Sequence, residues 1–252
     1  MQPTARRIGM ITPSSNTVAE PVTSDLARGL REVSLHVTRL RVTRISLAAA
    51  DTEQFGEDAF VDAAGLLADA RVDVIAWNGT SGSWLGPEYD RRVCGAMERA
   101  TGGPATTSTL AVLAALQVCE VKRLGLLTPY TGDIVDAITV NYAAHGFPVR
   151  AGRHFGRTTN FDFALTTDDE LDTAFEELAA QGCDAVAVVC TNLRAAHLAR
   201  SWEARTGVTV IDSVAATLWD ALRLSGGTTA IEGYGRLLAT PAGTPEANST
   251  ER

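Results

Sequence analysis

The stretch Asp184-Ala-Val-Ala-Val-Val-Cys190-Thr191-Asn192-Leu-Arg194 decides how this chain is expected to fold. Its first half is an apolar run, long enough for a strand buried on both faces and too short for a helix. Thr191 and Asn192 are residue types that cap helices, so a helix is expected to begin directly after Cys190. Cys190 would then lie at the carboxyl end of a strand, where open parallel sheets bind their ligands.

Two interpretations of Cys190 stay open at this point. Backbone N–H groups and a helix amino terminus favour a thiolate, which would make Cys190 a reactive residue. A free thiol is also commonly a buried structural residue, and the stretch alone does not decide between the two.

The composition excludes several classes of protein. A chain of 252 residues can form one large α/β domain or two smaller ones. The net charge of −8, without a cluster of Lys and Arg, argues against a nucleic-acid partner. The cysteines Cys94, Cys119, Cys183 and Cys190 have no CxxC spacing and the histidines are scattered, so no metal is expected. No signal-peptide pattern or membrane-spanning run occurs, which predicts a cytoplasmic protein without a membrane partner.

Strand-like and helix-like segments alternate along the chain, which predicts parallel sheets with right-handed crossovers. Strands are predicted at 6–12, 34–42, 73–77, 105–107, 123–128, 147–155, 184–189 and 208–211. Helices are predicted at 17–30, within 51–70, at 88–100, 109–118, from the turn 129–132 to 144, at 168–181, after Cys190, and at 214–224.

The two halves of the chain resemble each other. Gly9-Met-Ile-Thr-Pro13 matches Gly125-Leu-Leu-Thr-Pro129, 116 residues later, and the segment 73–80 matches 184–191, 111 residues later. Two matches in the same order indicate a duplicated α/β unit. We therefore predict an α/β fold of two similar flavodoxin-like, parallel-sheet halves related by pseudo-two-fold symmetry, with the active site in the cleft between them. The expected division is 1–112 with the returning segment 213–238, then 113–212, and a flexible tail at 239–252.

Four loops follow strands and would converge on that cleft: 13–16, 79–83, 129–132 and 190–194. They carry neutral hydrogen-bonding side chains, namely Ser14, Ser15, Asn16, Thr80, Ser81, Tyr130, Cys190, Thr191 and Asn192. Such a set suits a carboxylate or an enediolate. It does not suit a phosphate, because no glycine-rich phosphate motif occurs in these loops. Helix capping is the alternative explanation for the Ser, Thr and Asn residues, although it does not explain Tyr130.

Several motifs together resemble the aspartate/glutamate racemase superfamily, in the branch that holds arylmalonate decarboxylase and maleate cis-trans isomerase. The resemblance covers residues 6–238 and is carried by Pro13-Ser-Ser-Asn16 with Glu20, Gly79-Thr-Ser81, Thr106-Thr-Ser108, Thr128-Pro-Tyr130, Cys190-Thr-Asn-Leu-Arg194, Trp219-Asp-Ala-Leu-Arg-Leu-Ser-Gly-Gly227 and Gly233-Tyr-Gly-Arg236. It implies an enzyme that acts on a small dicarboxylate or carboxylate and needs no cofactor. A homo-oligomeric state is left open.

Position 79 separates the activities of that branch. By the resemblance, racemases and isomerases use two cysteines, one from each half; the second matches Cys190, and the first would lie where this chain has Gly79. Arylmalonate decarboxylase looks like the match, since it has Gly-Thr-Ser at this loop. The resemblance then implies a cofactor-independent decarboxylase of a substituted malonate-type dicarboxylate, with an enediolate intermediate that Cys190 protonates.

In that interpretation the catalytic residues are Cys190 and a dioxyanion hole of Thr80, Ser81, Tyr130 and backbone N–H groups. The substrate-binding residues would be Pro13, Ser14, Ser15, Asn16, Gly79, Asn160, Thr191 and Asn192. Gly79 is also expected to leave room for a second thiol in a cysteine variant.

Two alternatives are kept. Pro13-Ser-Ser-Asn16, Asn160 and the segment after Cys190 resemble the isomerase side of the branch, which favours an isomerase or racemase that uses Cys190 and another partner. An ectoine-degradation auxiliary protein belongs to this second class. The third hypothesis is a family member without catalytic activity that only binds a carboxylate.

Overall fold

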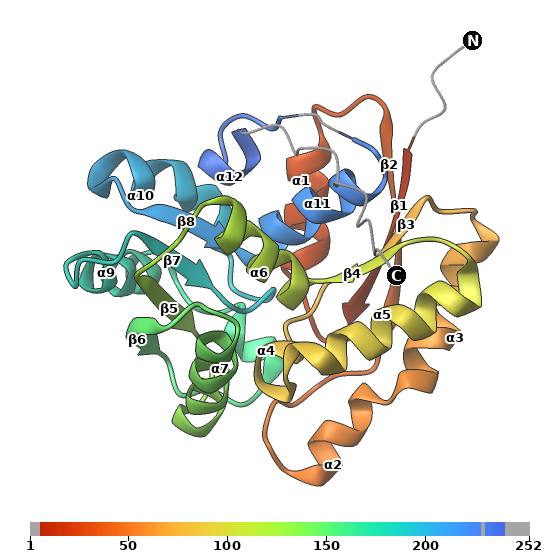
Figure 1. Ribbon diagram of the computed structural model, residues 1–252, viewed down its shortest axis with the longest axis horizontal. Coiled ribbons are helices and arrows are strands. Elements are labelled where there is room, and N and C mark those ends of the chain that lie inside the picture. The colour runs from red at the N-terminus through yellow and green to blue at the C-terminus, as the bar shows by residue number, and fades with distance from the viewer. Residues whose placement is uncertain (1–5, 228–229, 240–252) are drawn as a thin grey trace, which may run out of the picture.

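The computed structural model describes residues 6–227 and 230–239, which form two parallel four-stranded sheets (Figure 1). The strands are β1 Arg6–Pro13, β2 Val33–Leu40, β3 Val74–Trp77, β4 Ala105–Thr107, β5 Leu124–Thr128, β6 Val149–His154, β7 Ala185–Val188 and β8 Thr209–Asp212. The sheet orders are β2-β1-β3-β4 and β6-β5-β7-β8. The order is the same in both halves, as a duplicated unit requires, so the predicted fold class is confirmed. Of the expected flexible tail, 239–252, only Ala239 is described, as the last residue of a helix, and the rest lies outside the described residues.

The connections between the strands are helical. The helices are α1 Ala19–Ala27, α2 Ala49–Thr52, α3 Glu57–Asp69, α4 Gly82–Leu85, α5 Pro87–Thr101, α6 Ser108–Val118, α7 Gly132–Ala144, α8 Asn160–Phe163, α9 Asp168–Ala179, α10 Ala199–Thr206, α11 Ser213–Leu224 and α12 Arg236–Ala239, with 3-10 turns at Glu53–Phe55 and Ala196–Leu198. No helix in the described parts of the chain is long and apolar enough to cross a membrane.

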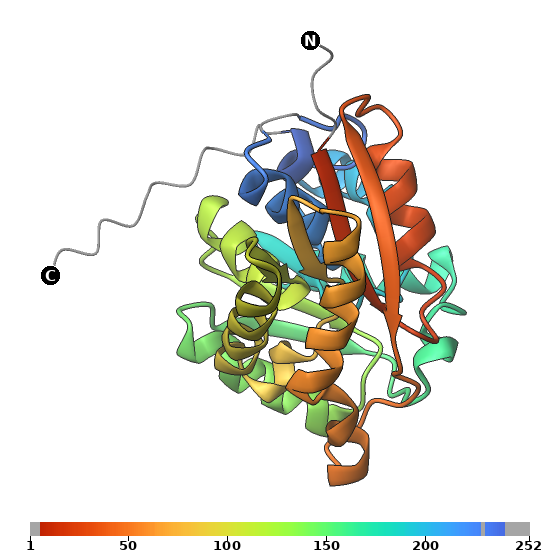
Figure 2. The same cartoon turned by 90° about the vertical axis from the view of Figure 1, so that its right-hand side faces the viewer.

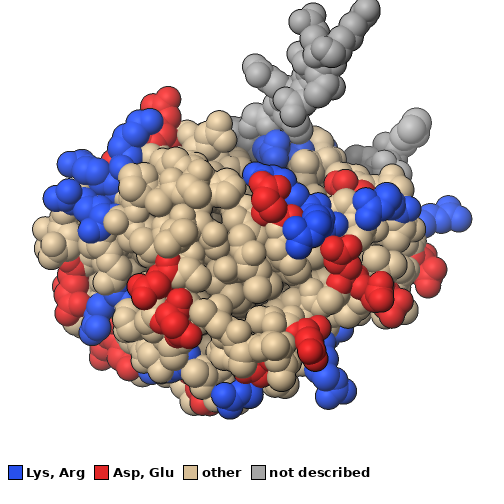
Figure 3. Space-filling model, turned by 60° about the horizontal axis from the view of Figure 1, so that its bottom comes forward, with Lys and Arg blue, Asp and Glu red and all other residues tan. Residues whose placement is uncertain are grey.

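Strand burial follows position in each sheet. β3 and β7 are wholly buried and wholly apolar, because each lies between two other strands and is covered on both faces. β2 and β6 are edge strands and keep partly exposed residues. The two sheets are joined by α6 and α11, which contact each other and both contact β4 and β8 (Figures 1 and 2). On the face shown in Figure 3, acidic and basic side chains are interspersed.

One predicted helix starts later than expected. Residues 191–193 form a turn and a bend, 194–195 are irregular, a 3-10 turn covers Ala196–Leu198, and α10 begins only at Ala199. Cys190 therefore lies at the carboxyl end of a strand, as predicted, but no helix begins beside it. The expected thiolate stabilisation by a helix dipole is wrong.

Candidate active site

The carboxyl ends of β1, β3, β5 and β7 meet between the two sheets, and side chains from the two halves bind one another there. The hydroxyl of Thr191 accepts from Asn16 Nδ2 at 3.0 Å and donates to the carbonyl of Asn78 at 3.1 Å. Asn160 Nδ2 donates to Ser15 Oγ at 2.8 Å. Since each of these bonds joins loops that are more than 100 residues apart, the halves are fixed relative to each other at this point.

A small cavity of about 20 Å³ lies where these strand ends meet. Its lining divides into a polar set and an apolar set of side chains around the backbone of Gly79. The polar residues are Thr80, Ser81, Tyr130, Asn160, Cys190 and Thr191, and the apolar residues are Pro13, Val42, Ile45, Phe55, Trp77 and Trp84. A volume of this size holds about one water molecule. A dicarboxylate can therefore enter only when lining segments move apart.

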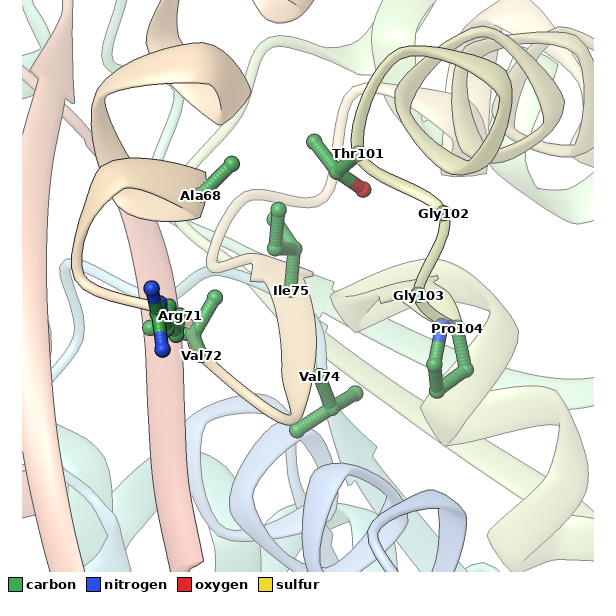
Figure 4. Close-up of a pocket in the computed structure, with 9 residues that line it drawn as sticks. All are labelled: Ala68, Arg71, Val72, Val74, Ile75, Thr101, Gly102, Gly103 and Pro104. Atoms are coloured by element: carbon green, nitrogen blue, oxygen red, sulfur yellow. The ribbon is translucent and has the colours of Figure 1, made fainter.

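A larger pocket of about 270 Å³ lies at the opposite, amino-terminal end of β3 and β4, between the ends of α3 and α5 (Figure 4). It is lined mainly by small and apolar residues such as Ala68, Val72 and Pro104, and Arg71 is its single ionisable residue. Its lining contains no thiol, no histidine and no carboxyl side chain. The small cavity at the carboxyl ends is the candidate active site.

Cys190 is the one thiol among the cavity-lining residues. It is 2% exposed, and its Sγ accepts a hydrogen bond from the backbone N–H of Asn192 at 3.3 Å. Burial raises the pKa of the thiol to about 12, against the lowering effect of hydrogen bonds from Tyr130, Asn192 and Leu193. The residue is consequently a thiol at neutral pH, suited to giving a proton rather than to attacking as a thiolate.

Thr80, Ser81 and Tyr130 form a compact group of hydroxyls beside Cys190. Tyr130 Oη and Thr80 Oγ1 are 2.8 Å apart and hydrogen-bonded, across the two halves. Ser81 Oγ accepts from Trp77 Nε1 at 3.1 Å. The backbone N–H groups of Thr80 and Ser81 have no hydrogen-bond partner among the described residues. The group can therefore offer several donors to one anionic oxygen pair.

The Tyr130 ring is held by edge-to-face contacts with Trp84 at 5.2 Å and with Phe163 at 5.4 Å between centroids. Burial raises the pKa of its hydroxyl well above the ordinary value. Tyr130 thus keeps its proton at neutral pH and remains a hydrogen-bond donor.

The comparisons with known proteins agree with this geometry. The family described as arylmalonate decarboxylase matches residues 8–238. The chain belongs to this family. It is 34% identical over 187 residues to arylmalonate decarboxylase of Bordetella bronchiseptica, covering 71% of this chain and 77% of that protein.

Two solved structures relate the chain to both branches of the resemblance. A liganded arylmalonate decarboxylase mutant, in which a glycine is replaced by cysteine and a cysteine by serine, matches with a TM-score of 0.79 and 29% identity, covering 93% of this chain and 99% of that one. A cysteine-to-serine mutant of Nocardia farcinica maleate cis-trans isomerase, with a covalently bound succinylcysteine intermediate, matches with a TM-score of 0.84 and 25% identity, covering 93% and 98%. This chain is thus related to enzymes of two reaction types.

The structure divides the site residues predicted from the sequence into two groups. Pro13, Gly79, Thr80, Ser81, Tyr130, Asn160, Cys190 and Thr191 line the cavity. Ser14, Ser15, Asn16 and Asn192 do not, and their polar atoms hold the loops in place. Asn16 Oδ1 caps α1 by accepting from Val18 and Ala19, and Ser14 and Ser15 both bond the backbone of Val42.

Sequence reasoning missed the apolar side of the cavity. Val42, Ile45 and Phe55 come from the segment between β2 and α3, and Trp84 comes from α4. Apolar side chains in such segments carry no motif, so nothing in the sequence distinguishes them from core residues. They line the cavity because the segment between β2 and α3 folds over the carboxyl ends of the strands, which is a feature of the tertiary structure.

The expectation that Gly79 leaves room for a side chain is wrong. A Cβ placed on Gly79 would lie 2.8 Å from Trp77 Nε1 and closer still to the ring carbons Cζ2 and Cε2. Gly79 is not among the residues with positive φ. The glycine is required at this position by the indole of Trp77, and not by backbone conformation.

Asp90 of α5 lies behind the loop that carries Thr80 and Ser81. Its carboxyl group is fully buried, accepts from Thr107 Oγ1, and packs so closely on Gly82 that no Cβ would fit there. Burial raises the pKa of this carboxyl from its ordinary 3.8 to about 7. Asp90 does not line the cavity, so its effect on the site is through the position of the loop.

We expect the variant Asp90→Asn to reduce the pH dependence of stability. A carboxyl whose pKa is raised on folding binds its proton more tightly in the native state, so its contribution is fully present below pH 3.8 and is lost as the pH rises through 7. Between pH 5 and pH 8 the loss is on the order of 2–3 kcal/mol. Urea unfolding at both pH values measures it, with the exposed Asp58→Asn as the control. An unchanged pH slope in the Asp90 variant would show that this carboxyl titrates normally.

Proposed function

We propose that this chain is a cofactor-independent decarboxylase of a substituted malonate-type dicarboxylate. The observation that carries the proposal is the mixed lining of the cavity. One set of residues, called the donor side, offers neutral donors and a single thiol; the other set, called the apolar side, has apolar side chains, and the lining contains no cation. Once the lining segments have moved apart, a substrate with two carboxylates on one carbon would place one carboxylate against each set.

The donor side would bind the carboxylate that is retained. Thr80, Ser81 and Tyr130, together with the unpartnered N–H groups of the loop, can stabilise an enediolate, in which both oxygens carry increased negative charge. Donors that are fixed before the reaction stabilise the transition state more than they stabilise the substrate, because charge on these oxygens grows as CO2 leaves.

The apolar side would face the carboxylate that is lost. Val42, Ile45 and Phe55 provide no hydrogen bond to a carboxylate placed against them. A carboxylate without hydrogen bonds is high in free energy, and its conversion into neutral CO2 removes that unfavourable charge. The apolar residues therefore favour the cleavage.

The reaction balances without a metal or an organic cofactor. The bond between the α carbon and the departing carboxylate breaks, CO2 leaves, and the electron pair forms the enediolate. The α carbon then takes the proton of Cys190 Sγ, and the thiolate recovers a proton from solvent before the next turnover. The raised pKa of Cys190, about 12, supports this role because the proton is present when the substrate binds.

An isomerase is the second candidate, because the related maleate isomerase structure holds a succinylcysteine. A comparable adduct here would have to form on Cys190, since Cys94, Cys119 and Cys183 are not among the cavity-lining residues. A nucleophilic cysteine is normally a thiolate, whereas burial raises the pKa of Cys190 and holds it in the thiol form. This difference favours the decarboxylase.

The proposal is tested by incubating the protein with phenylmalonate, 2-methyl-2-phenylmalonate, an alkylmalonate, maleate and aspartate. We expect CO2 release from a malonate and no conversion of maleate or aspartate. Proton NMR of the products in D2O and a CO2 assay distinguish the outcomes. Fumarate formed without CO2 would establish the isomerase instead, and binding without any turnover would establish a non-catalytic carboxylate-binding protein.

A further inference from the structure

The space beside Gly79 is filled by the side chain of Trp77, a residue of the same half of the chain. Trp77 is the last residue of β3 and lines the cavity together with Gly79 and Cys190. Its six-membered ring and Nε1 occupy the volume into which any Cβ at position 79 would project. A second acid, base or nucleophile at position 79 is thus excluded by Trp77.

Trp77 is also held firmly in this position. It is 1% exposed, and its ring lies edge-to-face on Phe60 with 5.0 Å between centroids. Its Nε1–H donates to Ser81 Oγ at 3.1 Å, and its carbonyl accepts from Ser108 Oγ. Turning the indole away would break the bond to Ser81 and open a void beside Phe60, so the ring cannot give way cheaply to a new side chain.

We propose that Trp77 closes position 79 to a second proton-transferring side chain, so that the site delivers a proton only from Cys190, on one face of the intermediate, unless both residues 77 and 79 are changed. The inference rests on the proposed decarboxylase for its stereochemical part, while its steric part stands on the geometry alone. Cys190 comes from the second half, and a side chain at position 79 of the first half would have to enter the volume that the Trp77 ring fills. The indole N–H has a second, positioning effect, because it fixes the hydroxyl of Ser81.

The steric part is tested by stability. We expect Gly79→Cys alone to lower the unfolding temperature by about 5–10 °C, as overpacking does. The same substitution in a Trp77→Leu background should cost far less, because the added thiol side chain refills part of the space that the smaller leucine leaves. Circular dichroism melts of the wild type, both single variants and the double variant measure this coupling. Additive changes in the four melting temperatures would overturn the steric claim, whether or not the protein is a decarboxylase.

The stereochemical part is tested with the prochiral 2-methyl-2-phenylmalonate in D2O. We expect the wild type and Trp77→Leu to give product enriched in one enantiomer, with Trp77→Leu slower. The double variant of Trp77→Leu and Gly79→Cys should give product of reduced enantiomeric excess and exchange the α proton of added 2-phenylpropionate. Chiral chromatography and proton NMR measure these results.

Two results would contradict the inference. One is a folded Gly79→Cys single variant that exchanges the α proton as fast as the double variant, because Trp77 would then be no obstacle. The other is a folded double variant that exchanges no α proton although the wild type decarboxylates. If the wild type releases no CO2 from any malonate, the proposed function fails, and the melting temperatures still decide the steric part.

Trp77→Phe separates the positioning effect from packing. Phenylalanine keeps an aromatic contact with Phe60 but has no N–H for Ser81. We expect kcat to fall about 3- to 10-fold, the effect of one lost hydrogen bond, with KM little changed and the enantiomeric excess retained. Phe60→Leu disturbs the packing without removing the N–H. If kcat falls as much in Phe60→Leu as in Trp77→Phe, the effect comes from packing and not from the lost hydrogen bond.

Discussion

Replacing Cys190 with alanine is expected to lower product formation by about 10²–10⁴-fold, the usual contribution of a positioned general acid. Cys190 is the one thiol of the cavity, and no lysine, histidine or carboxylate lines it to take over the proton. The substitution keeps the Cβ and removes only the Sγ and its bond to Asn192, so the fold should persist. The rate of product formation from a malonate, measured by proton NMR, checks this.

Cys183 is the matched control for that experiment. It is also a buried cysteine, 5% exposed, but it precedes β7 at the opposite end of the strand. Cys183→Ala should therefore retain nearly full activity while losing a similar amount of packing. Near wild-type turnover in Cys190→Ala would make Cys190 a structural residue and would remove the proposed proton transfer.

The fold could be predicted because its strongest signals are local. The apolar runs of β3 and β7 are buried on both faces, and buried strands have the short, continuous apolar pattern that both runs show. The repeat of two strands with their following loops, 9–13 in 125–129 and 73–80 in 184–191, predicted two similar halves. The same reasoning brought Cys190 and Tyr130 to one edge, since carboxyl ends of parallel strands lie together.

The segment after Cys190 could not be predicted because its side chains bind distant partners. Thr191 and Asn192 are good caps, but Asn192 Oδ1 accepts from the backbone of Thr17, and Thr191 Oγ1 donates to the carbonyl of Asn78. Asn192 Nδ2 also donates to the carbonyl of Asn160. The bonds to Thr17 and Asn78 join the two halves, and the bond to Asn160 lies within the second half. All three use groups that a helix amino terminus would need, and a single sequence contains no sign of them.

Trp77 illustrates the same limit at a functional position. At the end of an apolar strand it has the pattern of an ordinary core residue, and its ring does pack on Phe60. Its contact with Gly79 depends on how the chain turns after β3. The sequence therefore identified Gly79 as the informative position, but the residue that makes glycine necessary emerged only from the structure.

Tyr130→Phe, Thr80→Ala and Ser81→Ala are expected to lower kcat by about 10²–10³-fold each, because each removes a donor to the enediolate. KM should change little, since the donors bind the charge of the transition state more strongly than that of the substrate. Steady-state kinetics with the best malonate measures both constants. Changes confined to KM would mean that these hydroxyls only bind the substrate.

Tyr142→Phe is the matched control for the tyrosine. Tyr142 is also fully buried, and its hydroxyl bonds Ser83 of α4 at 3.2 Å, but it does not line the cavity. Its loss should alter stability and leave kcat nearly unchanged. An equal fall of kcat in both tyrosine variants would mean that the effect comes from loosening α4 and not from a lost donor.

The hydrogen bond between Thr80 and Tyr130 makes a sharper expectation possible. The two hydroxyls are 2.8 Å apart, so each fixes the direction in which the other donates. Removing either hydroxyl leaves the other without the partner that orients it. The fold-reduction of kcat in the double variant of Thr80→Ala and Tyr130→Phe should therefore be smaller than the product of the two single fold-reductions. The hydroxyl of Ser81 is held by Trp77 instead. The fold-reductions of kcat in Ser81→Ala and Tyr130→Phe should therefore multiply more nearly in the double variant. Strict multiplicativity for Thr80 and Tyr130 would show that the two donors act independently and that their bond does not survive substrate binding.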